Sequence, residues 1–264
     1  ERMNALLSNL ESDLLQSAKE LGPELFRRGR EIDETRHLPQ DLADNLAALG
    51  FYRLVVPSDL GGLGAFAAWD GLTLTDSGGY QIFSLQPKVD DQGATFRSIY
   101  DGSTHVLTPE GAAEVQADLG ADIQMVLDVC PALPAPEKVL CAAVERTAAW
   151  AARGRGAFLG HPDASARQSQ FGIVQGSVYH DLRAESVAAL EEIDFEGYAI
   201  GGLSVGESKS ELREMTELSC ECLPENQPRY LMGVGMPENL LECISLGVDM
   251  FDCVLPTRNA RNGM

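Results

Sequence analysis

The chain has 264 residues, of which 44% are hydrophobic, so it can bury one large α/β core or two small ones. Acidic residues outnumber basic residues by 40 to 20, and the net charge of -20 opposes general attraction to phosphate backbones or anionic lipid, so any nucleic-acid contact has to be local. No apolar stretch reaches membrane-spanning length and no charged-then-apolar leader opens the chain, so we expect a cytoplasmic protein without a membrane partner.

Residues 1–60 have the pattern of amphipathic helices. Apolar side chains recur at three- and four-residue steps over Leu6–Leu15 and again over Leu42–Leu49. The glycines of Gly61–Gly64 are typical of a turn or linker. We therefore expect an α-helical N-terminal segment that ends near residue 60.

After Gly64 the pattern changes to short apolar runs separated by amphipathic stretches, which is typical of β-α alternation around a buried parallel sheet. Six strands are predicted, over Leu72–Thr75, Ile123–Leu127, Phe171–Val174, Tyr198–Ile200, Tyr230–Val234 and Met250–Val254. Helices are predicted between them, over Pro109–Leu119, Pro136–Arg153, Asp181–Glu192, Ser208–Cys220 and Pro237–Leu246. Several of these helices open with Pro, Ser or Asp, as helix starts prefer.

Polar residues and glycines cluster where the predicted strands end, namely at Asp76, Asp128, Gln175, Gly201-Gly202, Gly233 and Asp252. In a (β/α) barrel the active site is assembled at the carboxyl ends of the strands, so this series predicts one site. Two carboxylates, Asp76 and Asp252, suit a double displacement at a sugar carbon, in which one attacks and the other handles the proton. Aspartates at strand ends also cap helices and bind metals, and these alternatives remain open.

The cysteines and histidines do not form a metal-ligand pattern. Cys220 and Cys222 are spaced like half of a zinc site, but no nearby Cys or His completes four ligands. The four histidines lie far apart in sequence. We therefore predict no metal site and reduced thiols rather than a disulfide framework.

Five ordered strings make the reading of residues 61–264 more specific. They are Thr75-Asp76-Ser77-Gly78-Gly79-Tyr80-Gln81, the GIVQGSV run from Gly172, the YAIGGLSVGE run from Tyr198, the YLMGVG run from Tyr230 and the GVDMFDCVLPTR run from Gly247. These strings are similar to the motifs of the tRNA-guanine transglycosylase (queuine tRNA-ribosyltransferase) family. Residues 61–264 therefore resemble the catalytic core of that family.

The resemblance implies a double displacement on tRNA. Asp252 would be the nucleophile that attacks the anomeric carbon of the wobble guanosine and expels guanine. Asp76 would be the general acid/base that moves the proton in both half-reactions. Asp128 resembles the residue that accepts from the amino and ring N–H groups of the purine.

The resemblance also implies a site for the flat base. Gln175 and the backbone N–H of Gly202 would contact the purine carbonyl, and the carbonyl of Leu203 would accept from the aminomethyl arm. Tyr80 and Met232 would sandwich the ring, although ordinary core packing is an alternative for both. Glu207 resembles the residue that supports the Leu203 peptide, and Val205 fits the bacterial form, which takes 7-aminomethyl-7-deazaguanine.

Arg258 and Arg261 form a small positive patch just after Asp252, and they would hold the anticodon loop; a solvated pair of terminal charges is the alternative. The implied partners are tRNA, the small-molecule base and, in a homodimer, a second copy of the chain. The family carries a zinc subdomain with a C-x-C-x2-C…H ligand set after the core, and the present sequence ends at Met264 without it. We therefore expect no cofactor from this chain.

The predicted fold of residues 61–264 is α/β, of the (β/α)8 TIM-barrel type, and incomplete, because six strands are visible where eight close the barrel. The segment 1–60 resembles the N-terminal helical domain of acyl-CoA dehydrogenases, through the LAALGFYRLVVP run from Leu46 and the following Gly61-Gly62. Two alternatives to an active transglycosylase follow. One is a catalytically inactive fragment or fusion that binds RNA or a partner protein, and the other is an acyl-CoA dehydrogenase-type flavoprotein.

Overall fold

The computed structural model of the chain describes residues 71–99 and 101–263. The predicted helical segment 1–60 and the predicted turn at Gly61–Gly64 lie outside these residues. The chain divides into two compact units, and most described residues belong to the one formed by Leu74–Phe96, Val106–Ala117 and Asp122–Met264. This second unit contains the whole of the main sheet.

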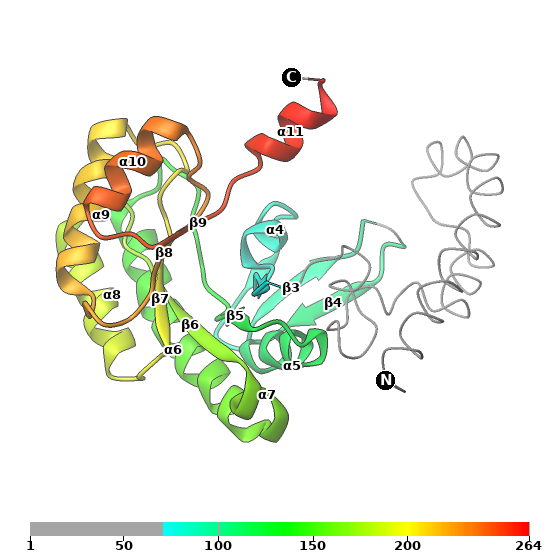
Figure 1. Cartoon of the computed structure of the whole chain (residues 1–264). Helices are drawn as coiled ribbons and strands as arrows, with labels where there is room; N and C mark the ends of the chain where they lie inside the picture. Colours follow the sequence, from blue (N-terminus) through cyan, green and yellow to red (C-terminus); the bar gives the residue numbers. More distant parts are fainter. Residues whose placement is uncertain (1–70, 100, 264) are drawn as a thin grey trace. The chain divides into compact units, whose positions relative to one another are not determined.

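The main sheet has six parallel strands, and each strand pairs with its neighbour in the sheet. The sheet curls as part of a barrel (Figure 1). Its order is β1 (Leu74–Thr75), β5 (Ile123–Met125), β6 (Ser169–Val174), β7 (Gly197–Ile200), β8 (Arg229–Leu231) and β9 (Met250–Phe251). All six predicted strands are confirmed, with shifted ends. The α/β class and the incomplete barrel are confirmed with them.

The five predicted helices are also present. They are α5 (Pro109–Leu119), α6 (Glu137–Gly160), α8 (His180–Glu191), α9 (Lys209–Cys222) and α10 (Pro237–Ser245). Helices α6, α8, α9 and α10 pack in succession along the outer side of the sheet, as Figure 1 shows. Each returns the chain to the amino end of the next strand, which is what a parallel sheet requires.

Several short elements were not predicted. They are the helices α4 (Gly79–Phe83), α7 (Pro162–Arg167) and α11 (Leu255–Arg261) and the strands β2 (Lys88–Val89), β3 (Ala94–Arg97) and β4 (Thr104–Leu107). The strands form a separate three-stranded sheet, in which β2 and β3 are antiparallel. All six elements are too short to show a hydrophobic period, and β4 has three exposed positions out of four.

The main core lies between the sheet and the outer helices. Every residue of β7 is buried, as are five of the six residues of β6, because parallel strands are covered on both faces. Their continuous apolar runs in the sequence reflect this burial. The buried cluster continues into α8 and α9 through Val187, Leu190 and Met215.

Buried side-chain hydrogen bonds fasten the helices to the strands. The amide of Gln116, on α5, donates to the carbonyl of Met125 over 2.8 Å and accepts from the Met125 N–H over 2.9 Å. Its oxygen also accepts from the hydroxyl of Thr75 over 3.0 Å. One buried amide thus holds α5, β5 and β1 together, at residues that shortly precede Asp76 and Asp128 in the sequence.

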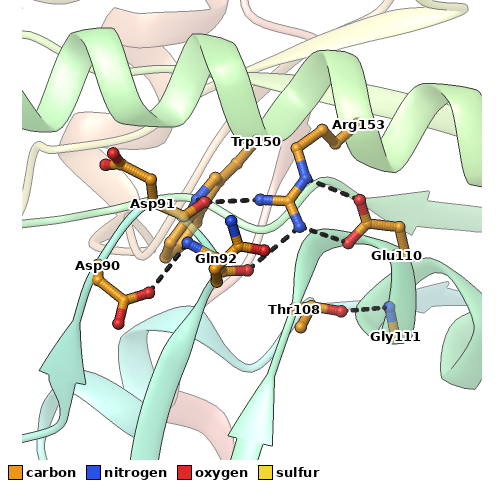
Figure 2. Close-up of polar contacts among 8 residues, drawn as sticks. All are labelled: Asp90, Asp91, Gln92, Thr108, Glu110, Gly111, Trp150 and Arg153. Carbon is orange, nitrogen blue, oxygen red and sulfur yellow. Dashed lines mark hydrogen bonds and ion pairs between the residues drawn. The ribbon is translucent and has the colours of Figure 1, made fainter.

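Arg153, on α6, joins that helix to one turn and to the start of another helix, as Figure 2 shows. Its guanidinium makes two hydrogen bonds of 2.7 Å to the carboxylate of Glu110 and donates to the carbonyl of Asp91 over 2.6 Å. The indole N–H of Trp150 donates to the same carbonyl over 3.1 Å. The turn between β2 and β3 is thereby tied to α6 and to the start of α5.

Helix α9 begins with a capping box, which explains why its start could be read from the sequence. The hydroxyl of Ser208 accepts from the N–H of Glu211 over 3.3 Å, and the carboxylate of Glu211 accepts from the N–H of Ser208 over 2.8 Å.

Within the described ranges, none of the helices combines the length and apolarity needed to cross a membrane.

Candidate active site

The predicted site residues follow the strands of the main sheet at its carboxyl edge. Asp76 comes directly after β1, Gln175 directly after β6 and Asp252 directly after β9. Asp128 and Gly202 lie slightly further along, in the segments after β5 and β7. Because all six strands are parallel, these segments emerge at one edge of the sheet, where (β/α) barrels assemble their sites.

The carboxylate of Asp252 is oriented by two donors. The hydroxyl of Tyr230 donates to Oδ1 of Asp252 over 2.8 Å, and the N–H of Gly233 donates to the same oxygen over 2.7 Å. Burial and the Asp252 carboxylate raise the pKa of Tyr230, so the phenol keeps its proton and remains a donor. The segment after β8 thus presents Asp252 in one orientation.

Asp76 shares the site with Asp252. Asp76 is solvent-exposed, yet desolvation by the surrounding protein raises its pKa; hydrogen bonds from the Ser77 N–H and the Gln81 side chain lower it, and the negative charge of Asp252 raises it further. The Ser77 N–H lies 2.8 Å from Oδ1 of Asp76. A carboxyl whose pKa is raised holds a proton more readily than an ordinary aspartate, which suits a general acid/base.

Asp128 is 7% exposed, and its pKa is shifted more than that of any other carboxyl of the site. Burial raises the pKa of Asp128 to about 7, the charge of Asp76 adds to the rise, and the Gln175 amide opposes it. The Nε2 atom of Gln175 donates to Oδ2 of Asp128 over 2.6 Å. Asp128 therefore binds the amide of Gln175 and also senses the charge of Asp76.

Gln175 lies against the glycine pair that follows β7. Gly202 has a φ of +63°, and a Cβ at this position would lie 2.5 Å from the amide oxygen of Gln175. Only glycine allows both this backbone conformation and this approach. The N–H of Gln175 donates to the hydroxyl of Ser186, on α8, over 3.0 Å. Leu203, which follows Gly202, is buried.

Glu207 lies under the segment that carries Leu203. Its carboxylate accepts from the N–H groups of Ser204 and Val205, the second over 3.0 Å. The hydroxyl of Ser204 donates to the carbonyl of Gly233 over 3.2 Å and so joins this segment to the one that orients Asp252. Two N–H groups of the loop are therefore satisfied by a single carboxylate.

Tyr80 and Met232 have different surroundings. Tyr80 lies on α4 and is 62% exposed, so core packing does not account for it. Met232 is half-buried and packs against the main core. For Met232 the alternative of ordinary core packing therefore remains open.

Arg258 and Arg261 lie on α11, which buries none of its residues. Their spacing of three residues places both on one side of the helix. Both are exposed, and this agrees equally with a binding role and with a solvated charge pair.

Sequence analysis missed Tyr230 and Ser186 as partners of the site. A tyrosine in a short buried strand needs a partner for its hydroxyl, and this signal could have pointed to Tyr230. No feature of the sequence distinguishes Ser186 from other helical serines. Among the described residues, no group of three or more His, Cys, Asp or Glu side chains is arranged to hold a metal ion, and Cys220 lies in the main core.

Comparisons with known proteins give a consistent result. A family model described as queuine tRNA-ribosyltransferase matches residues 51–264. A queuine tRNA-ribosyltransferase of Desulforudis audaxviator is 54% identical over 207 residues, which are 78% of this chain and 55% of that protein. One of Dehalococcoides mccartyi is 55% identical over 207 residues, covering 78% and 52%, and one of a Thermoanaerobacter species is 53% identical over 205 residues, covering 77% and 54%. The chain thus spans about half the length of these curated relatives.

Proposed function

The chain belongs to the queuine tRNA-ribosyltransferase family, and we propose that it exchanges the guanine at the wobble position of tRNA for 7-aminomethyl-7-deazaguanine. The observation that carries this proposal is the electrostatic interaction between two carboxylates that follow the first and the last strand of the sheet. Asp76 follows β1 and Asp252 follows β9, yet the charge of Asp252 raises the pKa of Asp76. A double displacement needs two such groups on either side of one sugar carbon.

In the first half-reaction, a carboxylate oxygen of Asp252 attacks C1′ of the wobble nucleoside and forms an ester bond. The bond between C1′ and guanine breaks, and its electron pair goes to the base, which takes a proton from the carboxylic acid of Asp76. Asp76 is suited to hold this proton because its pKa is raised above the ordinary value of an aspartate. Tyr230 and Gly233 keep Asp252 oriented for the attack.

In the second half-reaction, the Asp76 carboxylate removes a proton from the incoming base. The base nitrogen then attacks C1′, and the bond between C1′ and Asp252 breaks, which returns the Asp252 carboxylate. Each carboxyl ends the cycle in the protonation state in which it began. These steps use only carboxyl groups of the chain, and we propose that it supplies no cofactor for them.

We assign recognition of the base to Asp128, Gln175, Gly202 and Leu203. Asp128 accepts from the amino and ring N–H edge, while the Gln175 amide and the Gly202 N–H donate to the purine carbonyl. The Leu203 carbonyl accepts from the aminomethyl arm, and Tyr80 and Met232 lie against the faces of the ring. The hydrogen bond between Gln175 and Asp128 supports this assignment, because it holds the carboxyl acceptor and the amide donor side by side.

We further propose that tRNA binds through its anticodon loop to Arg258 and Arg261, and that the protein works in the cytoplasm, with a homodimer as its assembled form. Because α11 buries none of its residues, both arginines are accessible to tRNA, as this role requires. The competing proposal is an inactive chain that binds RNA or a partner protein.

The deciding experiment measures the incorporation of labelled guanine into unmodified tRNA by the full 264-residue chain. Asp252→Asn and Asp76→Asn should each lower the exchange rate by at least about a thousandfold, because each removes a group that the chemistry requires. Asp249→Asn is the matched control. Asp249 precedes β9, its Oδ2 accepts from the backbone N–H of Arg229, and an asparagine oxygen can still accept there.

A second readout reports the attack of Asp252 on C1′ directly. Wild-type chain incubated with tRNA and denatured should retain a covalent protein-tRNA adduct, and Asp252→Asn should not. Wild-type chain that gives neither exchange nor adduct would contradict the proposed activity and favour the inactive alternative.

A further inference from the structure

A buried arginine lies beneath the loops to which base recognition is assigned. Arg183, on α8, is 0% exposed. Its Nε donates to the carbonyl of Ser177 over 2.6 Å, and its Nη2 donates to the carbonyl of Gly201 over 3.0 Å. Its Nη1 lies 3.5 Å from the hydroxyl of Ser219 on α9. A buried charge is costly, so a cation held here by backbone carbonyls indicates a specific role.

The two carbonyls belong to different loops of the site. Ser177 follows Gln175 in the segment after β6, and Gly201 precedes Gly202 in the segment after β7. Gln175 and Gly202 are in turn in close contact with each other, as described above. The guanidinium therefore joins the two loops from below at positions next to the residues that meet the base.

The backbone around the guanidinium is shaped to accept it. Gly176 has a φ of +129°, and a Cβ there would lie 2.7 Å from the backbone nitrogen of Arg183 and 2.9 Å from its Cγ. Ser177 has a φ of +53°, a conformation that non-glycine residues rarely adopt. This turn directs the Ser177 carbonyl to Nε of Arg183 and brings Arg183 under the loop.

The surrounding charges keep Arg183 ionised. Burial lowers the pKa of Arg183 to about 10, and the carboxylate of Glu207 opposes the fall. Arg183 therefore carries its positive charge at neutral pH. Glu207 itself accepts from the N–H groups of Ser204 and Val205, so the cation and the anion hold opposite ends of one loop.

We propose that Arg183 is a positioning residue that fixes the distance between Gln175 and Gly202, and so sets the affinity of the site for the base. This inference rests on the proposed function. The physical reason is the planar fork of the guanidinium, whose separate N–H groups reach both carbonyls at fixed angles. A lysine would keep the charge but offers one nitrogen, which cannot span both loops in the same geometry.

The test compares Arg183→Lys and Arg183→Met with the wild-type chain. Both variants should bind guanine about tenfold to a hundredfold more weakly by calorimetry, because small misplacement of contact groups has large effects. In the exchange assay, KM for guanine should rise by a similar factor, while KM for tRNA should stay within about twofold. A purely structural role would lower the active fraction, and therefore kcat, without this split.

Arg155→Lys and Arg155→Met are the matched controls. Arg155, on α6, is another buried arginine, and it makes hydrogen bonds of 2.8 and 2.7 Å to Glu196. Glu196 directly precedes β7, so it lies at the amino ends of the strands, away from the candidate site. These variants should leave guanine affinity unchanged even where they lower the melting temperature. If Arg183→Met does not fold, Arg183→Lys, which keeps the charge and volume, carries the comparison.

The outcomes separate the two proposals. Wild-type exchange together with unchanged guanine affinity in a folded Arg183→Lys variant would overturn the positioning role and leave the function intact. Equal losses in the Arg155 and Arg183 variants would also overturn it. Wild-type chain that neither exchanges nor binds guanine would overturn the proposed function, and the inference with it.

Discussion

The hydroxyl of Tyr230 lies 2.8 Å from Oδ1 of Asp252, although Tyr230 belongs to β8 and Asp252 follows β9. The pairing of Tyr230 with Met250 in parallel register explains the contact, because Asp252 is two positions beyond Met250 and its side chain points to the same face. The Gly233 N–H binds the same oxygen. Of the two carboxylate oxygens, Oδ1 is therefore the anchored one, and we assign the attack to Oδ2.

Tyr230→Phe should accordingly slow the exchange without abolishing it. Loss of one of two donors lets the carboxylate rotate, and we expect kcat to fall by roughly tenfold while KM for guanine changes little. Steady-state exchange kinetics measure both constants. Tyr198→Phe, which removes a hydroxyl from a buried tyrosine on β7, is the control and should leave kcat unchanged. An unaffected kcat in Tyr230→Phe would show that Gly233 alone suffices.

The raised pKa of Asp128 predicts how stability depends on pH. Its folded pKa of about 7 lies above the value of an unfolded aspartate, about 3.9, so the folded state binds the proton more tightly. This contribution to stability is present below about pH 4 and is lost as the pH rises through about 7. Asp76, whose pKa is also raised, acts in the same direction.

Asp128→Asn should remove that dependence. Between pH 5 and pH 8 the free energy of unfolding of the wild-type chain should fall by roughly 2 kcal/mol more than that of the variant. Urea titrations followed by circular dichroism at four pH values give the comparison. The exposed Asp118→Asn serves as control and should follow the wild type. Parallel curves for wild type and Asp128→Asn would mean that the buried carboxyl keeps its ordinary pKa.

The centre of the main sheet could be predicted because its strands β6 and β7 are buried on both faces. The runs that contain Ile173 and Ala199 are apolar without alternation, and the helix starts at Pro109 and Ser208 carry local capping signals. The strands Ala94–Arg97 and Thr104–Leu107 were missed because they are short and belong to a separate sheet with exposed positions. Their existence depends on pairing between strands, which no local pattern reports.

The edge of the sheet that carries the candidate site was also predictable. Aspartates and glycines after strands mark that edge, and the roles proposed for them come from the resemblance of the ordered motifs. The supporting residues could not be found this way. Arg183 stands in a helix, where an arginine is expected to be exposed, and its partners are carbonyls of two loops that follow different strands.

Arg153 should contribute more to stability than its neighbour Arg146 on the same helix. Arg153 makes paired bonds to Glu110 and donates to the carbonyls of Asp91 and Gln92, whereas Arg146 makes one bond of 3.3 Å to the exposed side chain of Asp91. We expect Arg153→Met to lower the free energy of unfolding by about 1–2 kcal/mol and Arg146→Met by less than about 0.5 kcal/mol. Chemical denaturation measures the difference. Equal effects would contradict the anchoring role shown in Figure 2.

The two arginines of α11 should contribute most of their effect through salt-dependent binding of tRNA. The chain is strongly acidic, so a local cationic patch has to overcome the general repulsion of the phosphates. Replacing Arg258 and Arg261 together by glutamine should weaken tRNA binding several-fold at low salt. It should also reduce the slope of log K against log salt concentration by roughly 1.4, the value for two phosphate contacts to a single strand.

Filter binding of labelled tRNA across a series of salt concentrations measures this slope. The control replaces Arg167 and Arg213, two exposed arginines on α7 and α9, by glutamine, which makes the same change in net charge. If the patch acts locally, the control keeps the wild-type slope while the α11 variant loses part of it. If both double variants lose the same amount, the effect comes from net charge alone, and Arg258 and Arg261 are the solvated pair that the sequence also allowed.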